Sequence, residues 1–204
     1  MNEKHQKDLE MIRSIMERSS RFISLSGWSG IMAGVIALVA AYAGLYFIKE
    51  SGGDYFGNQL IPYSSNLITN LVITLLLTLL LAVFFGVYFT IQKSKKNKQK
   101  LWNSLSRRLL FSLVVPLLAG GIFCFALYNQ HHFGMVAPVM LIFYGLGLMN
   151  ASKYTLNDVE YLGYCELVLG LAALFLPGYG LVFWAAGFGL LHIIYGIVMQ
   201  KKYH

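Results

Sequence analysis

The sequence predicts an all-α integral membrane protein, a bundle of six transmembrane helices with both termini in the cytoplasm. Of the 204 residues, 57% are hydrophobic and only 12% are charged, and the mean hydropathy is +0.60. A soluble domain typically carries about 25% charged residues. The chain therefore has more apolar surface than one soluble domain can bury, which excludes a disordered chain, a nucleic-acid-binding domain and a soluble enzyme.

The first half of the chain contains two long runs without acidic or basic side chains. The run between Arg21 and Lys49 has 27 residues, and the run between Asp54 and Lys93 has 38. Both exceed the roughly 20 residues that a transmembrane helix needs. Each run therefore predicts one span.

The second half divides into four spans at two turns. A run of 44 residues between Arg108 and Lys153 has room for two helices, and the polar residues 128–132 separate them. The Pro-Gly-Tyr-Gly sequence at 177–180 predicts a tight reversal between the last two spans. The expected spans are 23–48, 66–92, 107–127, 134–152, 158–177 and 180–200, which form one transmembrane domain over residues 23–204.

The distribution of basic residues predicts the orientation. With six spans, every lysine and arginine except Lys49 lies on the same side as the two termini. Basic residues close to helix ends are retained in the cytoplasm, so both termini are expected there. The net charge of +7 is then a topology signal, and no nucleic-acid partner is expected.

Two segments on the cytoplasmic side are expected to meet the membrane surface. Residues 1–22 form an amphipathic helix that either lies on the headgroups or docks on a membrane or cytoplasmic partner protein. Lysines that follow the second span attract anionic headgroups at about 1 kcal/mol each, and they also fix the topology. These lysines are Lys93, Lys95, Lys96, Lys98 and Lys100.

Similar sequences recur at the ends of the even-numbered spans. Phe85-Gly86, Tyr144-Gly145 and Tyr195-Gly196 each precede a polar segment, and the odd-numbered spans share a glycine followed by apolar residues. Three helical hairpins in parallel orientation would explain both patterns. The repeat is a hypothesis that superposition of the three hairpins would test.

Four segments carry a resemblance to a group of small bacterial inner-membrane proteins without assigned activity. They are residues 25–34 (LSGWSGIMAG), 141–145 (LIFYG), 150–156 (NASKYTL) and 161–166 (YLGYCE). The pattern of the last hairpin, Gly170 to Pro177 and then Gly187 to Gly196, is more loosely similar to three-hairpin acid-resistance membrane proteins of the HdeD type. The resemblance implies a multi-pass protein of the bacterial cytoplasmic membrane, and it brings no catalytic residues.

Small residues mark the faces on which helices are expected to pack. Ser26, Gly30 and Gly34 are spaced four residues apart, so that another helix backbone can approach closely. This face serves either packing within the chain or homo-oligomer formation. The same role is expected for Gly163, Gly170, Gly189 and Gly196 in the last two spans.

Polar residues inside the spans are the candidates for a ligand or proton site, because burying them in lipid costs free energy. In the second span they recur every four residues and form a stripe that should face protein. The stripe consists of Asn66, Asn70, Thr74 and Thr78. In the last two spans Glu166 and His192 both lie among small residues, on faces expected to contact other helices.

Glu166 and His192 are expected to lie side by side near the middle of the membrane. Glu166 precedes Pro177 by 11 residues and His192 follows Gly180 by 12, which places each about 17 Å from the reversal at 1.5 Å per residue. The pair is either a structural latch between two helices or a site that titrates protons or binds a ligand. The sequence leaves both alternatives open.

No metal or cofactor site is expected. Cys124 and Cys165 fall inside spans, where they behave as small apolar residues, and His131 and His132 are neighbours in a turn without a carboxylate or cysteine nearby. Asp158 is expected to satisfy the start of the fifth span as part of a capping box.

Three function classes remain to be weighed. An intramembrane enzyme is not expected, because the chain lacks the known nucleophile and zinc motifs and a second intramembrane carboxylate. A small oligomeric transporter or channel would use the Glu/His pair and the Asn/Thr stripe as its polar path. The favoured interpretation is a non-catalytic membrane module for interaction, sensing or stress-related scaffolding, which needs only a partner.

Overall fold

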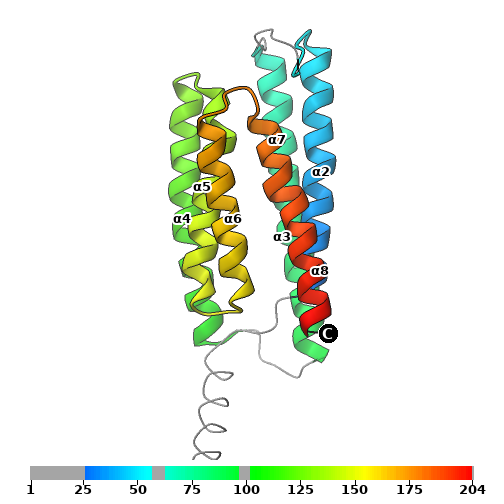
Figure 1. The fold of residues 1–204 in the computed structure, drawn as a ribbon, viewed down its shortest axis with the longest axis vertical. Helices are drawn as coiled ribbons and strands as arrows, with labels where there is room; N and C mark the ends of the chain where they lie inside the picture. Colours follow the sequence, from blue (N-terminus) through cyan, green and yellow to red (C-terminus); the bar gives the residue numbers. More distant parts are fainter. Residues whose placement is uncertain (1–25, 57–62, 97–101, 204) are drawn as a thin grey trace, which may run out of the picture.

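The computed structural model describes residues 26–56, 63–96 and 102–203, and this part of the chain is helical throughout, with short turns. Figure 1 shows long helices that run nearly parallel to one another. In chain order they are α2 (Gly27–Glu50), α3 (Ser65–Lys96), α4 (Ser104–Asn129), the 3-10 turn η1 (Phe133–Met135), α5 (Val136–Ser152), α6 (Asp158–Leu174), α7 (Gly180–Trp184), the π-helix η2 (Ala185–Leu191) and α8 (His192–Tyr203).

Five helices are long and apolar enough to cross a membrane. They are α2, α3, α4, the segment Phe133–Ser152 that joins η1 to α5, and the segment Gly180–Tyr203 that joins α7, η2 and α8. Helix α6 has 17 residues, or about 26 Å at 1.5 Å per residue, against a hydrocarbon core of about 30 Å. The predicted all-helical fold is therefore confirmed, and five of its helices, rather than the predicted six, are long and apolar enough to span a membrane.

The turns between the helices lie close to the predicted positions. Helix α4 ends at Asn129, and His131 adopts a positive φ of 59° in the turn that follows. Helix α6 ends at Leu174, three residues before the predicted reversal, and Gly178 turns the chain with a φ of +93°. This left-handed conformation is one that glycine adopts without a steric cost.

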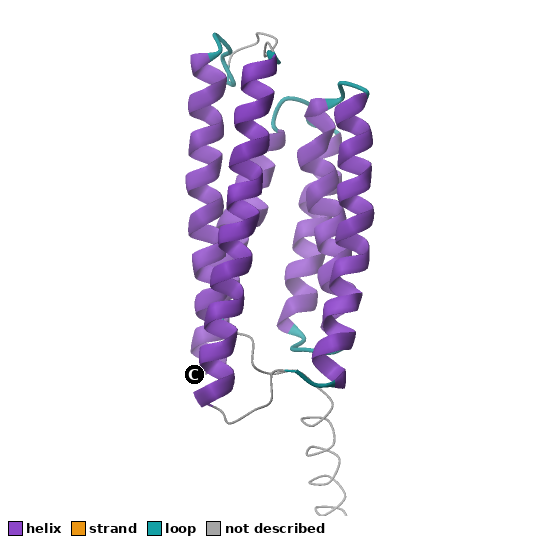
Figure 2. Cartoon of the chain, turned by 180° about the vertical axis from the view of Figure 1, so that it is seen from behind, coloured by secondary structure: helices purple, strands orange, loops and turns teal. Residues whose placement is uncertain are grey.

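The helices form two groups of three. Helix α5 packs between α4 and α6, and α2 packs between α3 and the α7–η2–α8 helix. Figures 1 and 2 show the two groups side by side from opposite directions. The groups meet mainly where α5 and α6 contact α7, η2 and α8.

Glycines hold α2 against η2 and α8. A side chain at Gly30 would meet the backbone of His192 and Gly196, and one at Gly34 would meet the Gly189 carbonyl and the backbone of Ile193. Of the predicted face Ser26, Gly30 and Gly34, the two glycines therefore pack against helices of the same chain, and Ser26 is buried.

Glycines also allow close contact between α5 and α6. Gly145 and Gly163 approach each other's carbonyl oxygens, and Gly170 lies against the backbone of Ile142. The glycines that were predicted to pack in the last two spans, Gly163, Gly170, Gly189 and Gly196, thus all lie where two helices are in close contact.

The third predicted hairpin does not pack like the first two. Helices α2 and α3 lie together, and so do α4 and α5, whereas α6 packs mainly on α5, and α8 mainly on α2. Figure 1 shows α6 and α8 in different groups. The hairpin repeat therefore stays a prediction.

Part of the predicted cytoplasmic surface lies outside the described residues. This applies to the amphipathic helix at 1–22 and to Lys98 and Lys100. Of the other three lysines, Lys95 and Lys96 are exposed at the end of α3, and Lys93 is buried.

Candidate functional site

Glu166 and His192 meet where the two helix groups come together. The His192 Nδ1 atom lies 3.3 Å from Glu166 Oε1. The Glu166 residue is fully buried and His192 is 6% exposed. The expectation that equal distances from the reversal would bring the two side chains together is confirmed.

Two further groups hold the imidazole. Nδ1 lies 3.1 Å from the carbonyl oxygen of Gly187, and Nε2 lies 2.8 Å from the hydroxyl of Tyr144 on α5. A carbonyl only accepts hydrogen bonds, so Nδ1 carries a proton and donates it. Nε2 either accepts the Tyr144 hydroxyl proton, when the ring is neutral, or donates to that oxygen, when the ring is charged. Both ring nitrogens of His192 therefore have hydrogen-bond partners whether the ring is neutral or charged.

The glutamate is less well satisfied than the histidine. Among the described residues, neither oxygen of its carboxyl group has a hydrogen-bond partner. The Glu166–His192 contact is therefore an ion-pair distance without regular hydrogen-bond geometry. A buried carboxyl group without hydrogen bonds is costly, so this position depends on its histidine neighbour.

The absence of a side chain at Gly187, in the π-helix, provides the space for the glutamate. A side-chain carbon at Gly187 would collide with Glu166 Oε2 and with Leu141 on α5. Gly187 lies within η2, and His192 begins α8 directly after it. Single-turn π-helices inside α-helices are rare and are frequent at functional sites.

The cluster formed by Tyr144, Glu166, Gly187 and His192 has two arrangements without net charge. In one arrangement both the carboxyl group and the imidazole are neutral, and in the other the glutamate is ionised beside an imidazolium. A further proton makes the buried cluster positive, and a missing proton makes it negative. Either change is opposed by burial, because a net charge is stabilised far better by water than by apolar surroundings.

Aromatic rings surround the histidine. Phe188 lies one turn before His192, with 6.0 Å between ring centroids, and also contacts the Tyr144 ring at 5.0 Å. Trp184, one turn earlier, lies 5.3 Å from Phe188. The rings of Trp184, Phe188 and His192 therefore lie in a row along α7, η2 and α8.

The polar stripe of the second span does not reach this cluster. Helix α3 packs against α2 rather than against α6 or α8. Asn66 is exposed, and the other three residues of the stripe are half-buried. The Thr74 and Thr78 hydroxyls donate to the carbonyl oxygens of Asn70 and Thr74 in their own helix. The prediction that the stripe faces protein holds only in part.

Asp158 was predicted to cap the fifth span, but the N-cap residue of α6 is Asn157 and Asp158 is the first residue of the helix. Its carboxylate accepts hydrogen bonds from Lys202 Nζ at 2.9 and 3.1 Å and from the Tyr203 hydroxyl at 2.7 Å. The start of α6 is thereby tied to the end of α8. This is a second contact between the two helix groups, at the helix ends rather than in the middle.

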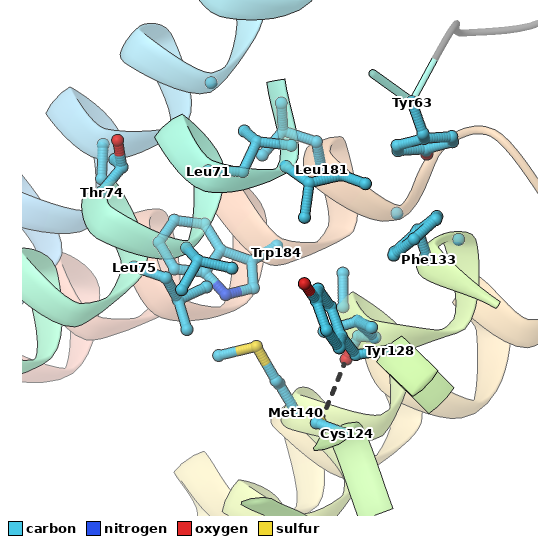
Figure 3. A pocket seen from close by; sticks show the side chains of 18 of the residues that line it. Tyr63, Leu71, Thr74, Leu75, Cys124, Tyr128, Phe133, Met140, Leu181 and Trp184 are labelled. Carbon is cyan, nitrogen blue, oxygen red and sulfur yellow. Dashed lines mark hydrogen bonds between the residues drawn. The ribbon is translucent and has the colours of Figure 1, made fainter. Parts of the chain in front are cut away.

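A pocket of about 680 Å³ lies between the two groups at the end where α2 ends and α3 begins. Residues of α2, α3, α4, η1, α5 and α7 line it, and neither Glu166 nor His192 belongs to the lining. Figure 3 shows Leu71, Leu75, Met140 and Leu181 around it, with Tyr128 and Tyr63 nearby. This pocket therefore does not connect the Asn/Thr stripe with the Glu/His pair, as the polar path of a transporter would have to do.

The pocket was not foreseen from the sequence, and neither was Tyr144 as a partner of His192. No family model, curated protein or solved structure matches this chain. In the described part of the chain no group of three or more His, Cys, Asp or Glu side chains is placed to hold a metal ion.

Proposed function

We propose that this chain is a non-catalytic membrane module that senses protons through the cluster of Tyr144, Glu166, Gly187 and His192. The single observation that carries the proposal is the fully buried Glu166 carboxyl group, which has His192 as its ion-pair neighbour. The cluster lies at the junction of the two helix groups, so a change in its charge acts on their packing. The groups facing it are the Tyr144 hydroxyl on α5 and, near Tyr144, the buried Tyr195 hydroxyl on α8.

The direction of the response follows from the charge of the cluster. The two net-neutral arrangements favour the packed state. Acid adds a proton to the cluster and gives it a positive charge, which water stabilises better than the surrounding apolar side chains do. Acid is therefore expected to loosen the contact of α6 with η2 and α8, and a return to neutral pH to restore it.

The distance between the two helix groups tests this proposal. Spin labels at exposed Val83 on α3 and Phe111 on α4, in a chain with Cys124 and Cys165 replaced by alanine, report that distance by double electron–electron resonance. We expect the distance to increase reversibly as the pH is lowered from 7. The variant Glu166→Gln/His192→Gln, which has no ionisable group at these positions, should keep one distance over the same acidification. The same change in parent and variant would overturn the proposal.

The topology belongs to the proposal as well. We propose six spans, with α6 as the short fifth one, both termini in the cytoplasm and residence in a bacterial inner membrane. Support comes from the one-sided distribution of basic residues and from the course of α6 alongside α5. The partner expected for such a module is another membrane or cytoplasmic protein, or a second copy of the chain.

Labelling of single cysteines tests the topology. In a chain without native cysteines, an impermeant maleimide should label His132→Cys and Tyr179→Cys in intact cells, because both positions lie at exposed outer turns. Lys153→Cys, in the turn between α5 and α6, should be labelled only after permeabilisation. Labelling of Lys153→Cys and Tyr179→Cys from the same side would show that α6 does not cross the membrane.

The alternative of a transporter receives less support. It requires a polar path to the Glu/His pair, and the pocket between the helix groups is lined mainly by apolar side chains and does not include the pair.

A further inference from the structure

The pocket between the two helix groups contains an unused hydrogen-bond donor. Trp184 is 6% exposed, it lines the pocket, and its indole Nε1 has no hydrogen-bond partner among the described residues. In Figure 3 the indole nitrogen is turned toward the side of the pocket where Leu75 and Met140 lie. A buried N–H group normally has an acceptor, since leaving it unpaired costs about 1 to 3 kcal/mol.

The threonine hydroxyls and the cysteine thiol in the lining of the pocket already have acceptors. The hydroxyls of Thr69 and Thr74 donate to carbonyl oxygens of α3, and the Cys124 thiol points to the Val136 carbonyl oxygen at 3.9 Å. A molecule in the pocket therefore needs one acceptor at the depth of Trp184. Trp184 is four residues after Gly180, the start of α7, which is about 6 Å along the helix.

The described residues that line the pocket carry no charge, because none of them is Asp, Glu, Lys or Arg. Tyr55, at the end of the pocket, accepts hydrogen bonds from the backbone N–H groups of Leu181 and Val182 at 2.8 and 3.4 Å. Burial raises the pKa of this phenol above its usual value, although the two backbone hydrogen bonds act in the opposite direction. The tyrosine therefore remains neutral near pH 7, and a charged headgroup finds no counter-charge here.

The pocket extends along an apolar path. On α3 its lining reaches from Ile68 to Leu76, about 12 Å at 1.5 Å per residue, between Tyr63 at one end and leucines at the other. The volume of about 680 Å³ is within the roughly 300 to 1,000 Å³ typical of small-molecule pockets. Tryptophan and tyrosine are enriched where a membrane meets water, the level at which lipids carry their ester carbonyl groups.

We propose that this pocket binds one neutral acylglycerol lipid, with its ester carbonyl on the Trp184 indole N–H and its acyl chain along α3. The uncharged glycerol hydroxyls lie among Tyr55, Tyr63 and Tyr128 at the end of the pocket. The carbonyl oxygen supplies the acceptor that Trp184 lacks, and the chain fills the apolar space between α3 and α4. This site is separate from the proton-sensing cluster and does not depend on it.

Fluorescence quenching tests the proposal. In a chain whose only tryptophan is Trp184, a monoacylglycerol with a dibrominated acyl chain, added to protein in nanodiscs, should quench saturably at low mole fraction. Unlabelled monoacylglycerol should reverse the quenching. A chain with Trp28 as its only tryptophan, which is 49% exposed on α2, should be quenched only in proportion to the probe in the bilayer.

Two glycine variants distinguish the pocket from the general lipid surface. Gly121 lines the pocket and Gly86 does not, and a Cβ atom at either position meets no atom within 4 Å. Gly121→Leu should therefore place a side chain in the lining of the pocket and reduce saturable quenching, whereas Gly86→Leu should leave it unchanged. Removal of the donor in Trp184→Phe should weaken binding of radiolabelled monoacylglycerol by about fivefold, as loss of one hydrogen bond implies.

Three results would overturn the proposal. One is quenching by dibrominated phosphatidylglycerol, with an anionic headgroup, that equals quenching by the neutral probe, because the site would then be ordinary bilayer contact. Another is equal quenching in the Gly121→Leu and Gly86→Leu variants. The last is unsaturable quenching of Trp184.

Discussion

Replacing His192 by leucine is expected to lower the free energy of unfolding by about 3 to 5 kcal/mol. The substitution leaves the fully buried Glu166 carboxyl group without the imidazole 3.3 Å away and the Tyr144 hydroxyl without its partner. The free energy of unfolding can be measured by titrating the protein in mild-detergent micelles with sodium dodecyl sulfate. The lower stability should appear as a shift of the unfolding midpoint.

The control for this prediction replaces both members of the pair. The variant Glu166→Met/His192→Leu removes the buried acid together with the imidazole, and an apolar replacement of similar volume often costs little or even stabilises. The double variant should therefore be more stable than His192→Leu alone. If the single variant unfolds like the parent, or if the double variant is the least stable of the three, then Glu166 and His192 are not coupled as the geometry requires.

Replacing Gly34 by leucine is expected to cost about 3 kcal/mol of stability, the upper part of the range for overpacked interiors. The first atom of the new side chain would meet the Gly189 carbonyl and the backbone nitrogen of Ile193, which no side-chain rotation can move. The helices α2 and α8 would have to separate. Loss of stability in the same detergent titration measures the effect.

Gly86→Leu is the matched control for this interface. Gly86 is also in a long helix, but a Cβ atom there meets no atom within 4 Å. Both substitutions replace glycine by a residue that favours helices, a gain of up to about 1 kcal/mol each. The difference between the two variants therefore isolates the packing of α2 on α8. Equal stability of the two variants would mean that this interface is loose enough to accept a side chain.

The helices could be predicted from the sequence because local composition determines where a membrane helix forms. The runs without charges predicted helices within a few residues of α2, α3, α4, α5 and the α7–η2–α8 helix. The Glu166–His192 contact was also predictable, because the two residues belong to consecutive helices and lie equally far from one turn. The distance of each residue from the turn, counted along its helix, is then enough to predict that the two side chains meet.

Three further features could not be predicted, because they depend on how helices distant in the sequence pack together, and no local sequence pattern indicates that packing. Tyr144 belongs to α5, outside the hairpin of α6 and α8, so counting from the reversal does not place it beside His192. The pocket exists because α3 packs on α2 and stays apart from α4, and both helices are equally apolar in sequence. The link of Asp158 to Lys202 and Tyr203 likewise joins ends of helices that are far apart in the sequence.

The π-helix sets the relative phase of two surfaces on one continuous rod. Each residue of an α-helix advances the side-chain direction by about 100°, so the wider turn of Ala185–Leu191 changes the direction of everything that follows it. Trp184, before the segment, lines the pocket, while His192 and Gly196, after it, face the acid on α6 and the glycines on α2. A uniform α-helix of the same length would present these residues with a different angular offset. The π-helix Ala185–Leu191 therefore allows one continuous helix to line the pocket and to contact both α6 and α2.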